Sequence, residues 1–316
     1  MAPYIIRRAV LLVPVMLVVG TVTFVLLHLT PGDPAAVMLG PEATPAEVAD
    51  LRDRLGLNEP LYLQYGQWIA HILRLDFGES IFLDMSVRSA LLDRLAPSFQ
   101  LTLYAFTLSV ILGVPAGVLA ALWRDSWLDR MLMALAVTGA AVPGFVFGIG
   151  LIYLFGVTLG WLPTGGYVPF LEDPVAHMRA MVLPVFALGF TSAALPARLV
   201  RSSMLDVLSE DYVRTAVAKG MPPRVVAIQH ALRSALLPAI TVLAVRLADL
   251  LGGAVIVETV FQIPGMGSLI VNSIARRDLP VIQGAVMLFA VFYILCNLLA
   301  DILYMYADPR VRYGRY

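Results

Sequence analysis

Residues 9–29 read AVLLVPVMLVVGTVTFVLLHL, a stretch without a charged side chain that decides the class of the fold. About 20 apolar residues are enough for a helix to cross the roughly 30 Å hydrocarbon core of a bilayer. Arg7 and Arg8 precede this stretch, as basic residues precede a signal peptide, but the apolar core of a signal peptide has only about 7 to 15 residues. The sequence therefore favours an uncleaved transmembrane helix over a cleaved leader.

The composition extends this interpretation to the whole chain. Of the 316 residues, 59% are hydrophobic and 14% are charged, whereas a soluble domain carries roughly 25% charged residues. So few charges cannot cover a water-facing surface, which argues against a soluble enzyme. Lys and Arg together number 22, as do Asp and Glu, so no net basic charge attracts phosphate backbones and nucleic acid is not an expected partner. The single cysteine, Cys296, excludes a disulfide within the chain.

The gaps between charged residues predict five further spans. A charge at the bilayer centre costs about 2.5 to 3.5 kcal/mol on insertion scales, so charge-poor stretches mark crossings. These stretches are residues 97–122, 131–157, 180–197, 234–257 and 279–306. We therefore expect an all-α integral membrane protein with six transmembrane helices. Its parts are an N-terminal region (1–96), a five-helix core (97–306) with a loop at 198–233, and a tail (307–316).

The distribution of cations predicts the orientation in the membrane. Short cytoplasmic loops retain Lys and Arg, whereas long translocated regions are exempt from this rule. With the N-terminus inside, the inner segments hold most of the cations, and the short outer loops hold only Arg179, Arg276 and Arg277. Both termini are thus expected in the cytoplasm, and residues 30–96 form an extracytoplasmic region.

Two amphipathic patterns lie in this outer region. Thr44-Pro45-Ala46-Glu47 has the pattern of a capped helix start, with Thr as the N-cap and Glu at the third helical position. Leu61, Tyr65, Trp68, Ile69 and Ile72 recur at helical spacing, with aromatic residues suited to a membrane interface. The residues leave two interpretations open: a cap packed on the helix bundle, or a docking surface for an external protein.

The inner loop 198–233 contains a short predicted helix. Ser209, Glu210 and Asp211 favour a helix start, and Gly220 stops the helix before Pro222-Pro223. Val213, Ala216 and Val217 fall on one face at i, i+3 and i+4 spacing. Such a helix can bind a partner protein or rest on lipid headgroups, and composition alone does not decide between them.

Ionisable and glycine-rich segments near the membrane supply candidates for a translocation path. Arg246 and Asp249 lie three residues apart within a span, so they share a helical face. The path is one interpretation of this pair, and a neutralising pair between helices is the other. The segment Phe261 to Gly267 is apolar and rich in glycine, which fits either a re-entrant gate or ordinary loop packing.

No catalytic apparatus is apparent in the sequence. It has no Gly-x4-Gly-Lys-Ser/Thr pattern, with which backbone amides and a lysine would hold nucleotide phosphates. Its four histidines are scattered at His28, His71, His177 and His230. We expect a non-catalytic protein that takes any energy for transport from a separate subunit.

Two inner-loop segments, RTAVAKG at 214–220 and HALRSALLP at 230–238, resemble the EAA loop of ABC-transporter permeases in the form used by dipeptide and oligopeptide importers. The resemblance extends to PGDP at 31–34, LGLNEPLYLQY at 55–65, DFGES at 76–80, ETVFQIPGMG at 258–267 and RDLPVIQG at 277–284. The long outer region is similar to that of the first of this family's two permease subunits. The general motif begins Glu-Ala-Ala, whereas Arg214-Thr215-Ala216 stands here, so no role of that Glu is carried over.

The resemblance implies a type I ABC importer permease whose residues 211–223 form a coupling helix in a groove of a cytoplasmic ATPase. The residues expected to couple to the ATPase are Tyr212, Arg214, Thr215, Ala216, Lys219 and Gly220. The candidates for the translocation path are Arg246, Asp249, Glu258, Phe261, Pro264 and Gly265. No cofactor is expected in this chain, because ATP and Mg²⁺ would bind the ATPases.

The implied partners are a second homologous permease, two ABC ATPases, an extracytoplasmic substrate-binding protein and a peptide cargo, in the inner membrane of a bacterium or archaeon. Nickel chelates, glutathione and oligosaccharides are alternative cargoes, because relatives that carry them share the loop signatures. A secondary transporter or channel that works alone is a rival from another class, and a membrane-embedded enzyme is a weaker one.

Overall fold

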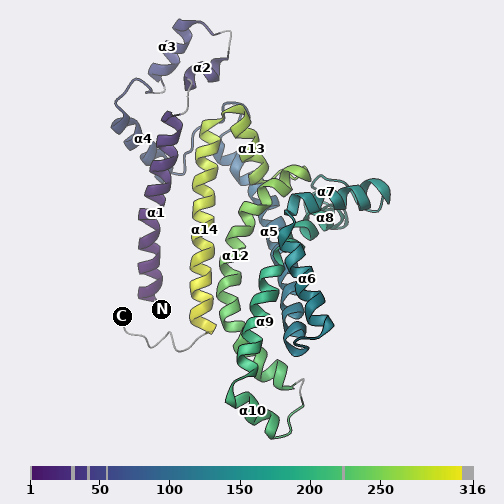
Figure 1. The fold of residues 1–316 in the computed structure, drawn as a ribbon. Helices are drawn as coiled ribbons and strands as arrows, with labels where there is room; N and C mark the ends of the chain where they lie inside the picture. Colours follow the sequence, from purple (N-terminus) through teal and green to yellow (C-terminus); the bar gives the residue numbers. More distant parts are fainter. Residues whose placement is uncertain (1, 30–32, 41–42, 55, 223–224, 308–316) are drawn as a thin grey trace. The chain divides into compact units, whose positions relative to one another are not determined.

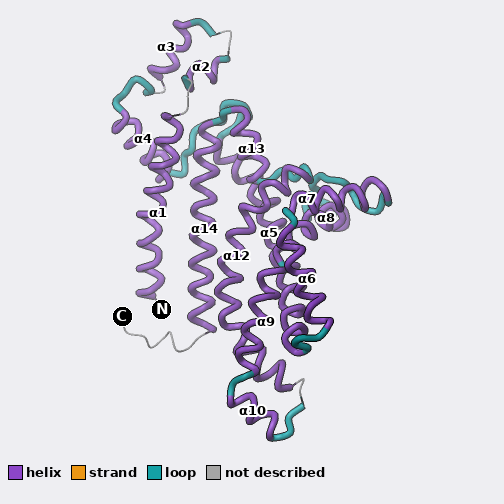
Figure 2. Tube along the Cα trace, in the orientation of Figure 1, coloured by secondary structure: helices purple, strands orange, loops and turns teal. Residues whose placement is uncertain are grey.

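A computed structural model describes residues 2–29, 33–40, 43–54, 56–222 and 225–307 (Figure 1). The predicted tail from residue 308 onward, and the positions of Leu55 and Pro223, lie outside the described residues. Helices and loops make up the described part of the chain, in which Glu79 and Ser86 form an isolated antiparallel bridge (Figure 2). The prediction of an all-α protein is confirmed.

Long apolar helices account for the predicted spans. Within the described residues, three stretches are long and apolar enough to cross a bilayer alone: Val87–Leu122, Pro174–Leu208 and Leu279–Leu299. Two bent pairs meet the same requirement together, Trp127–Ala141 with Gly144–Thr158 (bent by 99°) and Val226–Ile240 with Val242–Val260 (bent by 45°). The first predicted span holds a shorter apolar stretch, Val13–Val25. All six predicted spans thus fall on helices, of which up to five meet this requirement.

The chain forms two compact units, residues 1–96 with 269–292 and residues 97–268 with 293–316. The first unit holds α1 (Ala2–Leu29), α2 (Pro34–Leu39), α3 (Pro45–Arg54), α4 (Leu61–Leu73) and parts of α5 (Val87–Leu122), α13 (Met266–Arg276) and α14 (Leu279–Ala307). The predicted capping box starts α3: the Thr44 amide donates to the Glu47 carboxylate at 2.8 Å, and the Glu47 amide donates to the Thr44 hydroxyl at 3.4 Å. Asp33 likewise caps α2, which has proline at its first position.

The second unit holds the remainder of the helices. They are the rest of α5, α6 (Trp127–Ala141), α7 (Gly144–Leu151), the π-helix η1 (Ile152–Thr158), α8 (Pro174–Ser192), α9 (Ala194–Leu208), α10 (Asp211–Ala218), the π-helix η2 (Val226–Leu232), α12 (Arg233–Val260) and the end of α14. Pro143 explains the sharp bend between α6 and α7. A residue before proline is disfavoured in the helical region, and Val142 adopts φ −89° and ψ 122°.

Small residues let α5 approach α9 closely. A Cβ added at Gly113 would lie 2.7 Å from the carbonyl oxygen of Ala193, and one at Gly117 would lie 2.5 Å from that of Ala197. Glycines four residues apart allow such backbone contact between membrane helices. This contact, together with the packing of α9 on α6 and α12, fixes the helix that leads into α10.

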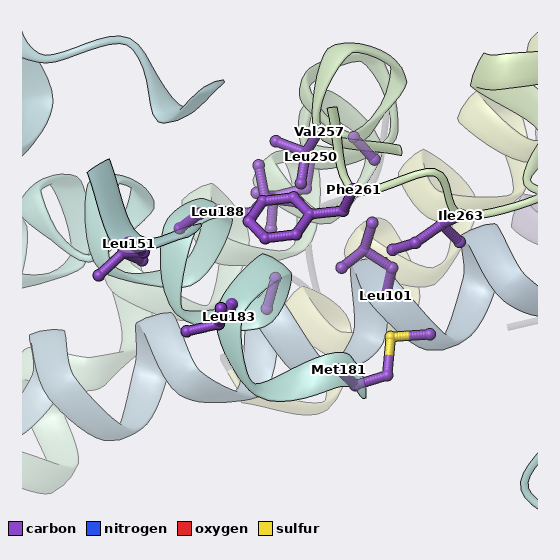
Figure 3. Packing of buried hydrophobic residues seen from close by; sticks show 12 residues of the cluster. Leu101, Leu151, Met181, Leu183, Leu188, Leu250, Val257, Phe261 and Ile263 are labelled. Carbon is purple, nitrogen blue, oxygen red and sulfur yellow. The ribbon is translucent and has the colours of Figure 1, made fainter. Parts of the chain in front are cut away.

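The core of the second unit surrounds Phe261. Its ring lies among Leu188, Leu250 and Val257, and Leu101 and Ile263 lie nearby (Figure 3). A Cβ at Gly148 would meet the Phe261 ring at 2.9 Å, so glycine in α7 makes room for this side chain. The segment that follows α12 is therefore anchored in the core.

Candidate functional site

The inner loop forms a small packed structure around α10. Val213 and Ala216 of α10 are buried against Val226 of η2, and Val207, Leu208 and Met221 pack beside them. Figure 1 shows α9 running into this loop, within the second unit. The predicted helix is confirmed, with one difference in its apolar face: Val217 is 58% exposed, because only the i, i+3 pair Val213 and Ala216 points inward.

The outward side of α10 carries most of the predicted coupling residues. Tyr212, Arg214, Thr215 and Lys219 are exposed, whereas Ala216 belongs to the packed side. The Tyr212 hydroxyl donates to the carbonyl oxygen of His230 at 3.4 Å and to the Ser234 hydroxyl at 3.3 Å, which joins α10 to the start of α12. This surface presents a tyrosine, two cations and the apolar Val217. A direct contact with an ATPase stays a prediction.

Gly220 ends α10 in the left-handed region. Its φ is +78°, and its amide donates to the carbonyl oxygen of Val217 at 2.9 Å. A residue with a side chain rarely adopts this φ, which glycine adopts freely. Among the described residues, no atom beyond its chain neighbours lies within 4 Å of the position that a Cβ would take. Glycine is therefore required here because of the positive φ, and not because neighbouring atoms would exclude a side chain.

The intramembrane pair lies on α12 as its spacing predicted. Arg246 Nη1 lies 3.3 Å from Asp249 Oδ2, and about half of each side chain is exposed. The pair is thus formed within one helix and faces away from the core of the unit. This placement is compatible with a translocation path, and the role itself stays a prediction.

Glu258 forms the centre of a buried hydrogen-bond network at the C-terminal end of α12. The Ser98 hydroxyl donates to Glu258 Oε1 at 2.5 Å, and the amides of Gly267 and Ser268 donate to Oε2 at 2.8 and 3.1 Å. The amide of Met266 donates to the Ser98 oxygen at 2.7 Å. The first three amides of α13 therefore find acceptors, and Glu258 acts as its cap.

The other outer candidates pack into the same region. A Cβ on Gly265 would collide with the Glu258 carboxylate and the Ser98 hydroxyl, so the backbone must pass there without a side chain. The carbonyl oxygen of Phe261 accepts from the amide of Gly166 at 2.8 Å, and Pro264 is half-buried. Glu258, Phe261 and Gly265 thus lie in the packed interior of the second unit. A path that touched them would require this packing to open.

Sequence reasoning missed an ion pair at the start of α6. Arg201 of α9 donates from Nε and Nη2 to the two carboxylate oxygens of Asp129, each at 2.7 Å. Asp129 also accepts from the amide of Asp125 at 3.0 Å and is 3% exposed. The two partners lie 72 residues apart in the chain, so no local pattern reveals the pair. It ties the helix that leads to α10 to the helix that leads to the bend at Pro143.

No metal centre is found among the described residues, where no three His, Cys, Asp or Glu side chains gather suitably. Within the second unit, apolar helices carry a compact loop around α10 after α9 and a capped, glycine-rich segment after α12. An arrangement of this kind is typical of a membrane protein that transports a solute or positions a partner protein.

Comparison with known proteins gives the class. Residues 113–313 match the family described as binding-protein-dependent transport system inner membrane component, and residues 1–102 match the N-terminal region of such membrane components. The chain belongs to this family, and it is a permease of the ABC transporter class in a multi-pass inner-membrane location.

Relatives match the chain along its whole length. A putative peptide transport system permease protein of Brucella abortus is 42% identical over 313 residues, covering 99% of this chain and 100% of the relative. A probable peptide ABC transporter permease protein of Sinorhizobium fredii is 45% identical over 314 residues, with the same coverage. The glutathione transport system permease protein GsiC of Salmonella typhimurium is 42% identical over 313 residues, again covering 99% and 100%.

Solved structures show the same fold. A chain of the MetNI methionine ABC transporter in an inward-facing conformation matches with a TM-score of 0.59 and 17% identity, covering 69% of this chain and 96% of the other. A chain of an amino acid ABC transporter matches with a TM-score of 0.52 and 16% identity, covering 69% and 94%. The fold is therefore that of a type I ABC importer permease, as predicted.

Proposed function

We propose that this permease forms half of the translocation path of an ATP-driven importer of short peptides. The observation that carries the proposal is the full-length match, at 42 and 45% identity, to relatives named as peptide transport permeases. The chain itself is proposed to be non-catalytic, with ATP and Mg²⁺ on partner ATPases. It would assemble with a second permease, two ATPases and an extracytoplasmic binding protein, with both of its termini in the cytoplasm.

The outward side of α10 is the proposed contact with an ATPase. Val213 and Ala216 anchor the helix to η2, which leaves the side chains of Arg214, Val217 and Lys219 exposed to a partner. Because α10 packs on η2 and on the end of α9, a force on α10 would be transmitted to α9. This geometry supports a coupling role.

The coupling role is tested by Val217→Asp, which changes the exposed side of α10 and leaves Val213 and Ala216 in place. The variant and the wild type are co-expressed with the ATPases and the second permease and then purified in detergent. We expect Val217→Asp to lose ATPase copurification or to separate ATP turnover from peptide uptake. Ala49→Asp, the same charge change on exposed α3, is the matched control and should behave as wild type.

Equal copurification, ATP turnover and uptake for both variants would contradict the coupling surface. If the wild type captures no ATPase and the chain alone moves solute, the importer proposal itself fails. The two failures are therefore distinguishable in one set of preparations.

Glutathione is a second candidate cargo, favoured by the 42% identity to GsiC. Direct uptake separates the cargoes: a radiolabelled tripeptide other than glutathione and radiolabelled glutathione are offered in parallel to proteoliposomes holding the complete transporter. Uptake of the tripeptide but not of glutathione supports a general peptide importer. Uptake of glutathione alone assigns the cargo to glutathione.

A further inference from the structure

Helix α4 of the first unit has an apolar side that nothing in the described structure covers. Its 13 residues include no Asp, Glu, Lys or Arg and no buried side chain. Tyr62 is 73% exposed and Leu73 is 80% exposed. Ordinary amphipathic helices bury such residues, so this side needs an occupant.

The opposite side of α4 packs on α1. The hydroxyls of Tyr65 and Thr21 are 2.6 Å apart, and the Phe24 ring lies 5.2 Å from Tyr65 and 5.7 Å from Trp68. A Cβ on Gly20 would lie 3.2 Å from the Trp68 ring. This side therefore fixes α4 firmly along α1.

A third side is polar and already has partners. Gln67 Nε2 donates to Glu59 at 2.9 Å, and His71 Nδ1 lies 2.9 Å from the Asp76 carboxylate. Gln67 and His71 lie one helical turn apart, so they form one strip, whereas Tyr62, Ala70 and Leu73 form a neighbouring apolar strip, with Leu63 at the boundary between the two. The exposed surface of α4 is thus divided into an apolar strip and a polar strip.

The contacts with α1 and α14 set the depth of α4. The contact at Thr21 lies eight residues before Leu29, the end of the charge-free stretch, which is about 12 Å at 1.5 Å per helical residue. Trp68 Nε1 donates to Gln283 at 3.0 Å, four residues or about 6 Å into the span that starts at Leu279. Helix α4 therefore lies beside the outer ends of two membrane helices, within the depth of their apolar segments.

We propose that α4 is an interfacial helix whose apolar strip lies in the outer leaflet of the bilayer. Interfacial helices bury their apolar side about 5–10 Å into the boundary between headgroups and acyl chains, a depth that the contacts at Gln283 and Thr21, about 6 and 12 Å into the spans, bracket. Val18, Val22 and Val25 of α1 are also exposed, on a side without contacts to α4, as expected of a helix that faces lipid. The exposed Tyr62 is of a residue type enriched at this level of the membrane.

Nitroxide labels on single cysteines test the proposal, in the complete transporter reconstituted into vesicles of phosphatidylethanolamine and phosphatidylglycerol. Cysteines replace Tyr62 and Leu73 in a Cys296→Ala background, and collision with oxygen, which enters lipid, is compared with collision with a water-soluble nickel chelate. Val18→Cys is the reference in lipid, and Ala49→Cys on α3 is the reference in water. Each variant is first checked for wild-type ATP turnover.

We expect the labels at 62 and 73 to favour oxygen over nickel, as at 18, and the label of Gln67→Cys on the polar strip to favour nickel. Preference for nickel at 62 and 73, as at 49, would place the strip in water and overturn the proposal. Low collision with both reagents would show that a protein covers the strip, and would overturn it as well. Because none of these readouts depends on the cargo, failure here leaves the proposed function standing.

Discussion

Arg201 holds the carboxylate of Asp129 with two parallel hydrogen bonds of 2.7 Å, and so joins α9 to α6. The bidentate geometry is the strongest arrangement for an Arg–carboxylate pair. Asp129 is nearly inaccessible, and the Arg201 side chain is 27% exposed. Arg201 is therefore the main source of charge compensation for this carboxylate, which the amide of Asp125 also stabilises.

Replacing Arg201 should destabilise the protein. Arg201→Met leaves the buried Asp129 charge without its partner, and breaking such a pair costs about 3 kcal/mol. We expect this loss in the free energy of unfolding, measured by denaturant titration of the purified permease in mixed micelles. Arg198→Met, on the exposed side of the same helix, is the control and should change it by less than about 0.5 kcal/mol. Equal effects of the two changes would refute the importance of the pair.

Replacing the Glu258 carboxylate by an amide should weaken the start of α13. In Glu258→Gln, the side-chain NH₂ faces the amides of Gly267 and Ser268 or the Ser98 hydroxyl, so at least one acceptor is lost. Leaving buried donors unpaired costs about 1–3 kcal/mol. Hydrogen exchange of residues 266–268 should accelerate accordingly, whereas Thr259→Ala at an exposed neighbouring position should leave it unchanged. Unaltered exchange in Glu258→Gln would show that water or other groups replace the carboxylate.

Replacement by alanine should affect the stability of the protein differently at two glycines. Gly265→Ala forces a methyl group into the Glu258 carboxylate and the Ser98 hydroxyl, and we expect a loss of at least about 2 kcal/mol or failure to accumulate in the membrane. Gly150→Ala, in helix α7, meets nothing within 4 Å and should be neutral or slightly stabilising. The thermal unfolding midpoints of the two variants are compared, and we expect a lower midpoint for Gly265→Ala. Similar midpoints would contradict the packing at Gly265.

Acid should loosen the loop after α4. Hydrogen bonds from His71 and from the Gly78 amide lower the pKa of Asp76 below its ordinary value. A lowered pKa means that the stabilisation is present above the unfolded pKa, about 3.9, and is lost as the pH falls through the lower folded pKa. We expect the Gly78 amide to be protected from exchange at neutral pH and to lose protection only in strong acid, after correction for intrinsic rates. Asp76→Ala, which removes the acceptor, should have low protection at both pH values, and full protection in this variant would disprove the account.

Local signals in the sequence predicted several features correctly. The Thr44–Glu47 capping box, the end of α10 just before Gly220 and the Arg246–Asp249 pair each depend on residues within four positions of one another. Backbone geometry and helical periodicity fix such contacts before any tertiary packing. The functional roles assigned to the coupling residues stay predictions.

Contacts between segments far apart in the sequence could not be predicted from such local patterns. The Asp129–Arg201 pair and the Ser98–Glu258 bond join residues 72 and 160 positions apart. An Asp in the first turn of a helix also suits a simple N-terminal role, so Asp129 gave no sign of a distant partner. Glu258 was placed among the path candidates, and its burial follows from the loop at Gly265 that returns the chain over it.

The cap on α13 has a consequence for the cargo. The free amides at the start of a helix ordinarily attract anions, including carboxylates of ligands. Here the carboxylate of Glu258 and the hydroxyl of Ser98 already occupy those of Met266, Gly267 and Ser268. A carboxylate of the cargo would therefore find no free amide among these three, and other groups would have to bind it.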